Sequence, residues 1–343
     1  MIIDMHAHIV PENFPPAGGR PSAKDWPSMD HFEPGRAKVM IDGENFRTVT
    51  SGNWDNDRRL KDMESHGVIA EAISPMPELL SYWFTPQDGL DFSRHVNEYI
   101  LKMCSKSPGH FFGLGMVPLQ DPDMAAKELS SMKAAGLLGV ELGSNIEGKY
   151  LGDPSFVGFF QEAERLGMAV FVHSLHPTMM ADFPTPALSN PVGFPSETCL
   201  TIASFMAGGT AEKVPNLRIA WSHGGGTFPF LLGRYQNQWS GTWNEEPPSG
   251  DRGAEMRARQ PHSPAEIARR FYWDTLLFDA RAIRFLIDTM GPKQVLVGTD
   301  YPYQPPERPA DKTLKTLGLS QEVHDDITWN NCFRYLGVDA PKF

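Results

Sequence analysis

Two histidines near the start of the chain have the spacing of a metal-binding pair. His6 and His8 follow the apolar pair Ile2-Ile3, which predicts a buried β-strand. Because side chains i and i+2 of a strand point to the same side, the two imidazoles project together. Zinc accepts imidazole nitrogens, so the pair could supply half of a divalent-metal site. Such a pair also occurs by chance among core or surface residues, so further ligands are needed.

Further polar residues stand where predicted apolar strands end. His173, His223 and Asp300 are each the last residue of an apolar run. An imidazole or carboxylate there is costly unless it is hydrogen-bonded or ligates a metal. We predict that His6, His8, His173 and Asp300 bind one Zn²⁺ per chain, or another divalent metal, with a position left open for water or substrate. His223 would then be a general acid/base, because imidazole titrates near neutral pH.

The elements that must position these residues alternate between strands and helices. Helix ends are recognisable, as in the cap Asp121-Pro122 and the terminal Gly136. Strands are expected at 2–6, 68–74, 111–117, 137–142, 168–173, 217–223, 271–276 and 295–300. This α/β pattern favours a distorted (β/α)8 TIM barrel, in which functional groups collect at the C-terminal ends of the strands. An open doubly wound sheet is the alternative, but no Gly-x-Gly-x-x-Gly follows a strand to support nucleotide binding.

The stretch 11–50 interrupts this alternation. It begins with an irregular part, 11–35, rich in Pro, Gly and charge, and ends in two β-prone runs joined by Asp42-Gly43, a hairpin signal. We therefore expect a single domain, 1–343, that carries a small β-containing insertion at 11–50. The stretch 241–266, also rich in Pro, Gly and charge, is predicted to be a loop.

Composition restricts the partners and the location. The hydrophobic fraction of 41% and the charged fraction of 21% are typical of a soluble globular protein. The formal net charge of −11, from 31 basic and 42 acidic residues, argues against nucleic acid as a partner. Cys104, Cys199 and Cys332 are widely spaced without metal-ligand spacing, which favours reduced thiols in a cytoplasmic protein. We expect neither a signal peptide nor a membrane-spanning segment.

Several motifs resemble the amidohydrolase superfamily, in its decarboxylase branch. They are His6-Ala-His8, the strand-end His173, Ser222-His-Gly-Gly-Gly226 and Gly298-Thr-Asp-Tyr-Pro302. Other segments resemble the 2-amino-3-carboxymuconate-6-semialdehyde decarboxylase group of that branch, and the resemblance covers nearly the whole chain. These segments include Phe46-Arg47, Asn53-Trp54-Asp55, Leu80-Ser-Tyr-Trp83 and Phe228-Pro-Phe-Leu-Leu-Gly-Arg234. The resemblance implies one zinc ion with the ligands predicted above, and His223 as the catalytic acid/base. Binuclear relatives carry a bridging lysine at the end of the fourth strand, whereas 139–143 contains none.

The resemblance also implies a homodimer that binds a small carboxylate substrate. Arg47 and Arg234 of the neighbouring subunit would hold the carboxylates, because a guanidinium pairs with a carboxylate through two hydrogen bonds. Tyr82, Trp83 and Phe228 are candidate apolar walls of the pocket, although the default role of an aromatic residue is core packing.

Two positions depart from the family pattern and bear on the substrate. Asn190 stands where the family carries a tryptophan, and Ser174–Pro177 replaces a segment that usually contains an aspartate. His176, in that second segment, could reach the substrate or be a loop residue.

The expected activity is a zinc-dependent, non-oxidative decarboxylation of an unsaturated or aromatic acid. The expected substrate is 2-amino-3-carboxymuconate-6-semialdehyde, in tryptophan or aminobenzoate-type degradation. The alternatives are decarboxylation of a hydroxybenzoate-type acid, hydrolysis of a lactone or amide at the same site, and a binding protein without enzymatic activity.

Overall fold

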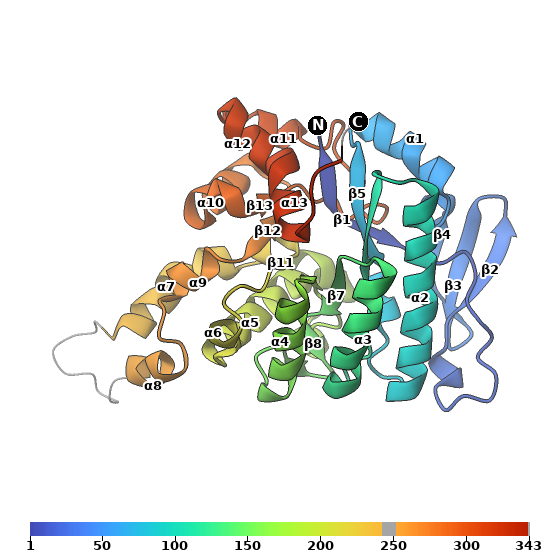
Figure 1. The fold of residues 1–343 in the computed structure, drawn as a ribbon, viewed down its shortest axis with the longest axis horizontal. Helices are drawn as coiled ribbons and strands as arrows, with labels where there is room; N and C mark the ends of the chain where they lie inside the picture. Colours follow the sequence, from blue (N-terminus) through green and yellow to red (C-terminus); the bar gives the residue numbers. More distant parts are fainter. Residues whose placement is uncertain (242–251, 342–343) are drawn as a thin grey trace.

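Eight parallel strands form the centre of the molecule, and a layer of helices surrounds them (Figure 1). The computed structural model describes residues 1–241 and 252–341. The strands follow the order β1 (Ile3–Ile9), β5 (Ala70–Pro75), β6 (Phe111–Gly115), β7 (Gly139–Gly143), β10 (Ala169–His173), β11 (Ile219–Trp221), β12 (Tyr272–Asp274) and β13 (Val295–Leu296). The amide of Met5 donates to the carbonyl of Val297 at 2.9 Å, and that of His8 to Tyr301 at 2.7 Å. These bonds join the last strand to the first, so the predicted distorted (β/α)8 barrel is confirmed.

The helices connect successive strands and cover the outside of the barrel. They are α1 (Asn56–His66), α2 (Pro86–Lys106), α3 (Pro122–Ala135), α4 (Val157–Leu166), α5 (Phe194–Ala207), α6 (Thr210–Lys213), α7 (Phe228–Ser240), α8 (Arg252–Arg259), α9 (Pro264–Ala268), α10 (Ala280–Met290), α11 (Lys312–Lys315), α12 (Gln321–Asp325) and α13 (Asn331–Leu336). The side chain of Asp121 caps α3, which ends at Gly136 with a φ of 106°. The cap and the terminal glycine read from the sequence therefore set the bounds of this helix.

Successive residues of each strand contribute alternately to two apolar cores, one outside the strands and one inside the barrel. In β10, Val170 and Val172 pack toward the surrounding helices, whereas Phe171 points into the barrel. The barrel interior is filled near the N-terminal ends of the strands, where Phe333 of α13 joins the same cluster. Because α13 closes this end, polar strand residues collect toward the opposite, C-terminal end of the barrel.

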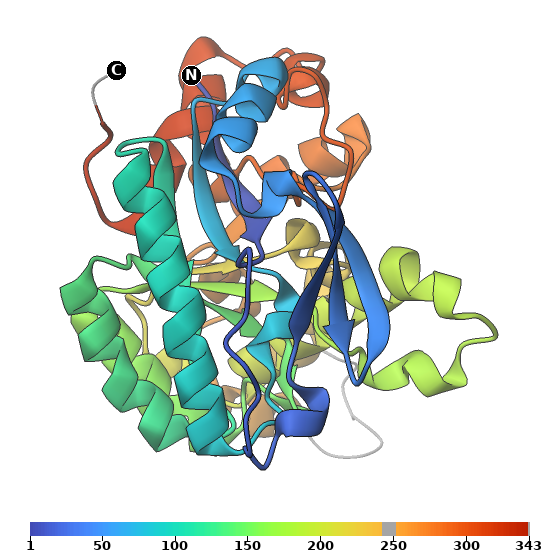
Figure 2. The same cartoon turned by 90° about the vertical axis from the view of Figure 1, so that its right-hand side faces the viewer.

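The insertion forms a separate three-stranded antiparallel sheet outside the barrel (Figure 2). It consists of β2 (Ser28–Glu33), β3 (Arg36–Ile41) and β4 (Glu44–Thr50). Asp42 and Gly43 turn the β3–β4 hairpin with φ values of 52° and 75°, as their sequence predicts. Strand β2 was not expected in the irregular part 11–35, since its side chains do not alternate between apolar and polar. Two short strands, β8 (Asn145–Ile146) and β9 (Lys149–Tyr150), form a further hairpin.

Several predicted boundaries are corrected by the structure, and β11 and β13, for example, are shorter than the predicted strands 217–223 and 295–300. Strand β1 continues to Ile9 and does not end at His6, so both His6 and His8 lie within the strand. The predicted loop 241–266 is wrong for the part that contains α8 and the start of α9, while residues 242–251 lie outside the described part of the chain. Ser263 and Glu266 form a capping box that begins α9, a local signal that the Pro- and Gly-rich composition concealed.

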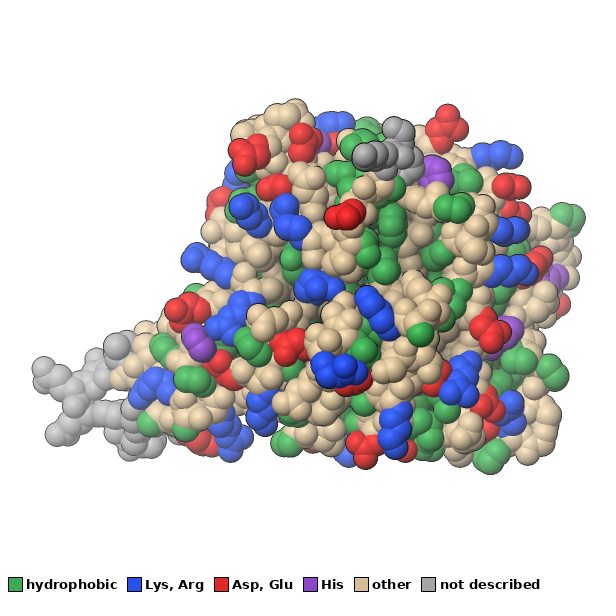
Figure 3. All heavy atoms as spheres, viewed as in Figure 1, with side chains coloured by type: hydrophobic (Ala, Val, Ile, Leu, Met, Phe, Trp, Pro, Cys, Tyr) green, Lys and Arg blue, Asp and Glu red, His purple; other side chains and the backbone are tan. Residues whose placement is uncertain are grey.

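The surface of the barrel carries mixed charge. On the face shown in Figure 3, acidic and basic side chains are interspersed over the helices and are not gathered by sign. Among the described residues, no helix combines the length and the apolar character needed to cross a bilayer.

Candidate metal centre and active site

A β-bulge in β1 turns both histidines of the first strand into the barrel. Asp4 pairs with Glu71 and Ala7 with Ile73, so Met5 and His6 together oppose Ala72. Such an extra residue shifts the alternation of the strand. Ile3 and Met5 therefore belong to the apolar interior, and His6 and His8 point to the same interior one layer above them. The side chain of Asp4 accepts the amide of His6 at 3.0 Å and that of Thr299 at 3.1 Å, which fastens the bulge to the segment leading to Asp300.

The four predicted metal ligands converge. His6, His8, His173 and Asp300 are all buried, and each offers a ligand atom within 4.8 Å of the others. The Nε2 atoms of His6 and His8 lie 3.1 Å apart, and Oδ1 of Asp300 lies 3.5 Å and 3.1 Å from them, respectively. Gly298 leaves room for this arrangement, because a Cβ atom there would lie 2.8 Å from Cβ of His6.

The outer nitrogen of each imidazole is held by a hydrogen-bond acceptor. Nδ1 of His6 bonds to Oδ2 of Asp274 at 2.7 Å, that of His8 to the carbonyl of Pro75 at 2.9 Å, and that of His173 to the carbonyl of Ser174 at 2.8 Å. These acceptors fix the proton on Nδ1, so the Nε2 lone pairs are free to bind a metal. Nε2 of His173 is buried and has no hydrogen-bond partner among the described residues. The donor set therefore fits a divalent cation.

The charges around the ligands also favour a cation. Burial, together with the nearby His223, lowers the pKa of His173 well below its ordinary value, so this imidazole is neutral, as a ligand must be. Burial alone would lower the pKa of His8 as well, but Glu141 and Asp300 raise it to about 10. For Asp300, burial opposes ionisation, yet its hydrogen bond with His8 and the charges of the histidines hold its pKa below the usual range. The excess of negative charge around the imidazoles is what a divalent ion would balance.

His223 lies beside this cluster, with its ring centroid 5.3 Å from that of His6 and 4.9 Å from that of His173. Its φ of 54° is unusual for a residue other than glycine, and Asp274 holds the turn. Oδ2 of Asp274 accepts the amide of His223 at 2.9 Å, and Oδ1 accepts that of Gly224 at 2.8 Å. Burial and the charge of His6 lower the pKa of His223 to about 4 despite the carboxylates nearby. The imidazole is therefore neutral at pH 7, and its buried Nδ1 has no hydrogen-bond partner in the described part of the chain.

Arg47 of β4 reaches the layer of aromatic rings next to the ligands. Its guanidinium carbon lies 4.5 Å from the centre of the Tyr303 ring, and that ring stacks on His8 at 5.7 Å. The hydroxyl of Tyr303 donates to Asn53 at 2.8 Å, which fixes the ring. Within 1–241 and 252–341, Arg47 forms no ion pair, so its donors are available to a ligand. The insertion sheet thus brings a free guanidinium close to the metal ligands.

Trp83 and His176 form a second flat surface. Their rings stack at 5.1 Å with an angle of 24° between the planes, and His176 has a φ of 43°. The loop that carries His176 is fastened by Asn145, whose amide donates to the carbonyl of Leu175 at 3.0 Å and to Oε1 of Glu197 at 2.8 Å. Asn190 lies farther along the same connection, in an exposed turn of π-helix at 189–193.

Three other residues singled out in the sequence make their described contacts with residues other than the four ligands. Tyr82 is buried, and its hydroxyl accepts the amide of Gly143 at 3.0 Å. Phe228 is buried against Trp273, with the two rings stacked at 6.1 Å. Arg234 is exposed on α7, where it lines a surface groove of about 590 Å³. The pocket roles of Tyr82 and Phe228 and the carboxylate-binding role of Arg234 stay predictions.

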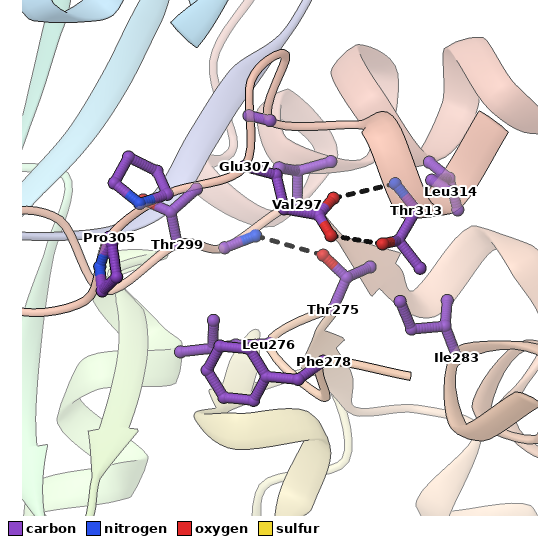
Figure 4. A pocket seen from close by; sticks show the side chains of 13 residues that line it. Thr275, Leu276, Phe278, Ile283, Val297, Thr299, Pro305, Glu307, Thr313 and Leu314 are labelled. Carbon is purple, nitrogen blue, oxygen red and sulfur yellow. Dashed lines mark hydrogen bonds between the residues drawn. The ribbon is translucent and has the colours of Figure 1, made fainter. Parts of the chain in front are cut away.

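A further cavity, of about 60 Å³, lies on the outer side of the barrel wall (Figure 4). Its lining includes Val297, Gly298 and Thr299, the segment that leads from the last strand to Asp300, together with residues of α10 and α11.

Asp274 and Tyr303 belong to the site but were not singled out in the sequence. Asp274 ends the seventh barrel strand, so its position at a C-terminal strand end was an available signal. Tyr303 lies in an irregular segment, and its ring stacks on His8 in the folded barrel. No local sequence pattern marks Tyr303 as a site residue.

Comparison with known proteins agrees with this geometry. A family model described as amidohydrolase matches residues 3–338. The chain is similar to 2-amino-3-carboxymuconate-6-semialdehyde decarboxylase of Dictyostelium discoideum, with 36% identity over 99% of this chain and 93% of that protein.

Two solved structures with the same fold are decarboxylases by name. One is 5-carboxyvanillate decarboxylase from Sphingomonas paucimobilis, with a TM-score of 0.73 and 26% identity, covering 82% of this chain and 83% of that one. Another is dihydroxybenzoic acid decarboxylase from Polaromonas sp. JS666 with bound manganese and 2-nitroresorcinol. Its TM-score is 0.71 at 21% identity, covering 82% of this chain and 85% of that one.

Proposed function

The chain belongs to the amidohydrolase family, and from this membership and its buried cluster of imidazoles we propose that it is a metal-dependent decarboxylase. The substrate that we propose is 2-amino-3-carboxymuconate-6-semialdehyde, on which a relative with 36% identity acts according to its name. The convergence of three imidazoles and one carboxylate beside the neutral His223 is the observation that carries the proposal.

We assign the metal to His6, His8, His173 and Asp300, with zinc as the proposed ion. The histidine-rich ligand set suits zinc, and manganese is the alternative because a decarboxylase of the same fold binds it. When bound, the cation supplies Lewis acidity toward an oxygen atom of the substrate or of water.

His223 has the properties of the proton-transfer residue. Decarboxylation breaks the bond between a carbon atom and its carboxylate, releases CO₂ and leaves a C–H bond, so one proton must reach that carbon. A neutral imidazole whose Nδ1 has no hydrogen-bond partner among the described residues can take up a proton and deliver it to the carbon. Phe194 stacks on His223 at 6.3 Å, which limits the orientations of the ring and covers one face.

Arg47 has the position of a carboxylate anchor. Its guanidinium is free of ion pairs in the described residues and is held by the ring of Tyr303. A charge-assisted pair with a substrate carboxylate would orient the reacting carbon toward His223 without taking part in bond breaking. The stacked rings of Trp83 and His176 offer a planar apolar surface for a conjugated or aromatic substrate.

A hydroxybenzoate-type substrate is the second candidate. It is supported by the planar Trp83–His176 surface and by the similarity to 5-carboxyvanillate decarboxylase, which has 26% identity. The deciding experiment gives the purified metal-loaded protein either 2-amino-3-carboxymuconate-6-semialdehyde or a panel of hydroxybenzoates and measures released CO₂. Release from the first compound alone supports our proposal, release from a benzoate alone selects the second candidate, and release from neither contradicts both.

We also propose a cytoplasmic homodimer in which Arg234 reaches the neighbouring site. The support is the groove on α5 and α7 beside Arg234, together with the exposed Phe230 and Leu231, whose exposed fractions are 81% and 40%. Apolar surface of this kind is typical of protein interfaces. The three free cysteines agree with a reducing compartment.

A mixing experiment tests the exchange of Arg234. Arg234→Ala and His223→Asn subunits would each be inactive alone. In a mixed dimer, the site of the Arg234→Ala subunit keeps its own His223 and receives Arg234 from its partner, so activity returns. If mixing restores nothing although mixed dimers form, Arg234 does not act across the interface.

A further inference from the structure

A carboxylate at the centre of β7 is buried inside the barrel without a hydrogen bond. Val140 and Leu142 belong to the outer apolar core, so Glu141 between them points inward. Its exposed fraction is 0%. Neither Oε1 nor Oε2 has a hydrogen-bond partner among the described residues. Because burying a carboxylate in this way is costly, the position calls for a function that offsets the cost.

The side chain that Glu141 faces is His8, one of the proposed metal ligands. Its Oε2 lies 3.4 Å from Nδ1 of His8. Both groups are fully buried, so little water screens the interaction between them. Gly139 and Gly143 lie on the same face of β7 as Glu141. Tyr82 packs against Gly143, where a Cβ atom would lie 2.9 Å from the Tyr82 ring. The backbone is therefore packed tightly on both sides of Glu141.

The orientation of His8 does not depend on Glu141. Nδ1 of His8 already has the carbonyl of Pro75 at 2.9 Å, and Oγ of Ser74 lies at 3.3 Å. The carbonyl of Pro75, the nearer acceptor, satisfies the one proton on Nδ1. The distance of 3.4 Å from Nδ1 to Oε2 of Glu141 is long for a charge-assisted hydrogen bond. What Glu141 adds is negative charge, which no other neighbour of Nδ1 supplies within the described part of the chain.

We propose that Glu141 is a positioning residue of the metal centre, whose charge strengthens the binding of a divalent cation through His8. A carboxylate near the outer nitrogen of an imidazole increases the basicity of the ligating nitrogen. His6 has such a carboxylate in Asp274, whereas His173 has only the carbonyl of Ser174. The inference rests on the proposed metal centre and assigns two of its three imidazoles a charged partner.

The test compares Glu141→Gln with Glu141→Met in the full-length chain. The glutamine keeps the shape and the hydrogen-bonding oxygen but loses the charge, while the methionine loses both. Affinity for Zn²⁺ and Co²⁺ is measured by competition with a chelator, and the visible spectrum of the Co²⁺ protein reports the coordination. If charge is the contribution, both variants bind about tenfold or more weakly, and the Co²⁺ spectrum shifts. Wild-type affinity in Glu141→Gln would overturn the proposal.

Three further variants make the result decisive. Glu128→Gln changes a buried carboxylate that pairs with Arg94 outside the barrel, and it should leave metal affinity unchanged. Glu141→Asp keeps the charge and should retain more metal affinity than Glu141→Gln. If circular dichroism shows that Glu141→Gln folds poorly, the affinity of Glu141→Asp still tests the role of the charge. If Glu141→Asp binds no better than a folded Glu141→Gln, charge is not the contribution. His173→Ala should lose binding; if it binds like the wild type, the proposed metal centre itself is wrong.

Discussion

Replacing Asp274 by Asn should weaken both the fold and the metal centre. The carboxylate accepts four hydrogen bonds: Nδ1 of His6 and the amide of His223 on Oδ2, and the amides of Gly224 and Leu276 on Oδ1. Asparagine keeps one of the two oxygens, so two donors lose their acceptor and face an N–H group instead. At about 1–3 kcal/mol for each unsatisfied buried donor, the free energy of unfolding falls by about 2–6 kcal/mol.

The loss of metal affinity follows from the same bonds. If the amide nitrogen faces His6, it favours the tautomer with the proton on Nε2, which cannot ligate. If it faces Gly224, the turn that holds His223 is disturbed. We expect the first arrangement, with roughly 10- to 100-fold weaker metal binding, because it breaks one main-chain bond, that of His223, whereas the second breaks two, those of Gly224 and Leu276.

The pH dependence of stability gives an independent measure. Burial alone would raise the pKa of Asp274, but its hydrogen bond with His6 and the charges of His6 and His223 lower it below 3.8. A carboxyl whose folded pKa is lowered stabilises the protein above its unfolded pKa, and this contribution is lost as pH falls through the folded pKa. The difference in unfolding free energy between wild type and Asp274→Asn should therefore be full at pH 7 and shrink below pH 3.8.

Urea unfolding at pH 7 and pH 3, with chelator competition at pH 7, measures these effects. Asp279→Asn is a matched control, because Asp279 caps α10 with amide bonds but touches no metal ligand. It should lower stability slightly and leave metal affinity unchanged. Equal stability and equal metal affinity of Asp274→Asn and wild type would refute the reasoning.

Four more outcomes are expected. His223→Asn, which tolerates the φ of 54°, should keep the metal by elemental analysis while turnover falls by roughly 10²- to 10⁴-fold; substantial CO₂ release would remove His223 from the reaction. Asp300→Asn, at a φ of 60°, should lose both metal and activity, and a fully loaded variant would exclude Asp300 as a ligand. Arg47→Lys should raise KM by about tenfold or more with kcat nearly unchanged, and an unchanged KM would contradict its role as an anchor. Burial raises the pKa of Cys104 to about 12, so Ellman's reagent at pH 8 should label this thiol slowly until urea is added; rapid labelling of the native chain would contradict that burial.

The barrel and its ligands were predictable because the signals are local. The apolar run that ends in His173 has the length of a strand, and caps such as Asp121 mark helix starts on their own. Once eight strands are placed in a closed barrel, their C-terminal ends must meet, and the ligands meet with them. Helix α9 shows the limit of composition, since a capping box of two residues outweighs the Pro- and Gly-rich stretch around it.

The contacts that orient the ligands could not be predicted in the same way. The pairing of Asp274 with His6 spans 268 residues, and the stacking of Tyr303 on His8 needs the closed barrel. The bulge in β1 depends on the register with β5, which no residue of β1 reveals alone. Glu141 looks like any acidic residue of a strand until the side to which it points is known.

The three imidazole ligands differ in how strongly mutation can disturb their orientation, because the hydrogen-bond acceptors on their outer nitrogens differ in kind. Two acceptors are main-chain carbonyls, at Pro75 and Ser174, which remain when the side chain is exchanged. The third is the carboxylate of Asp274, which a single nucleotide change can remove. Saturation mutagenesis should therefore find that small residues in place of the buried Ser174 keep metal affinity, whereas almost no residue does so at position 274. A lineage could redesign the loop after β10 for a new substrate while the metal ligand before it keeps its orientation.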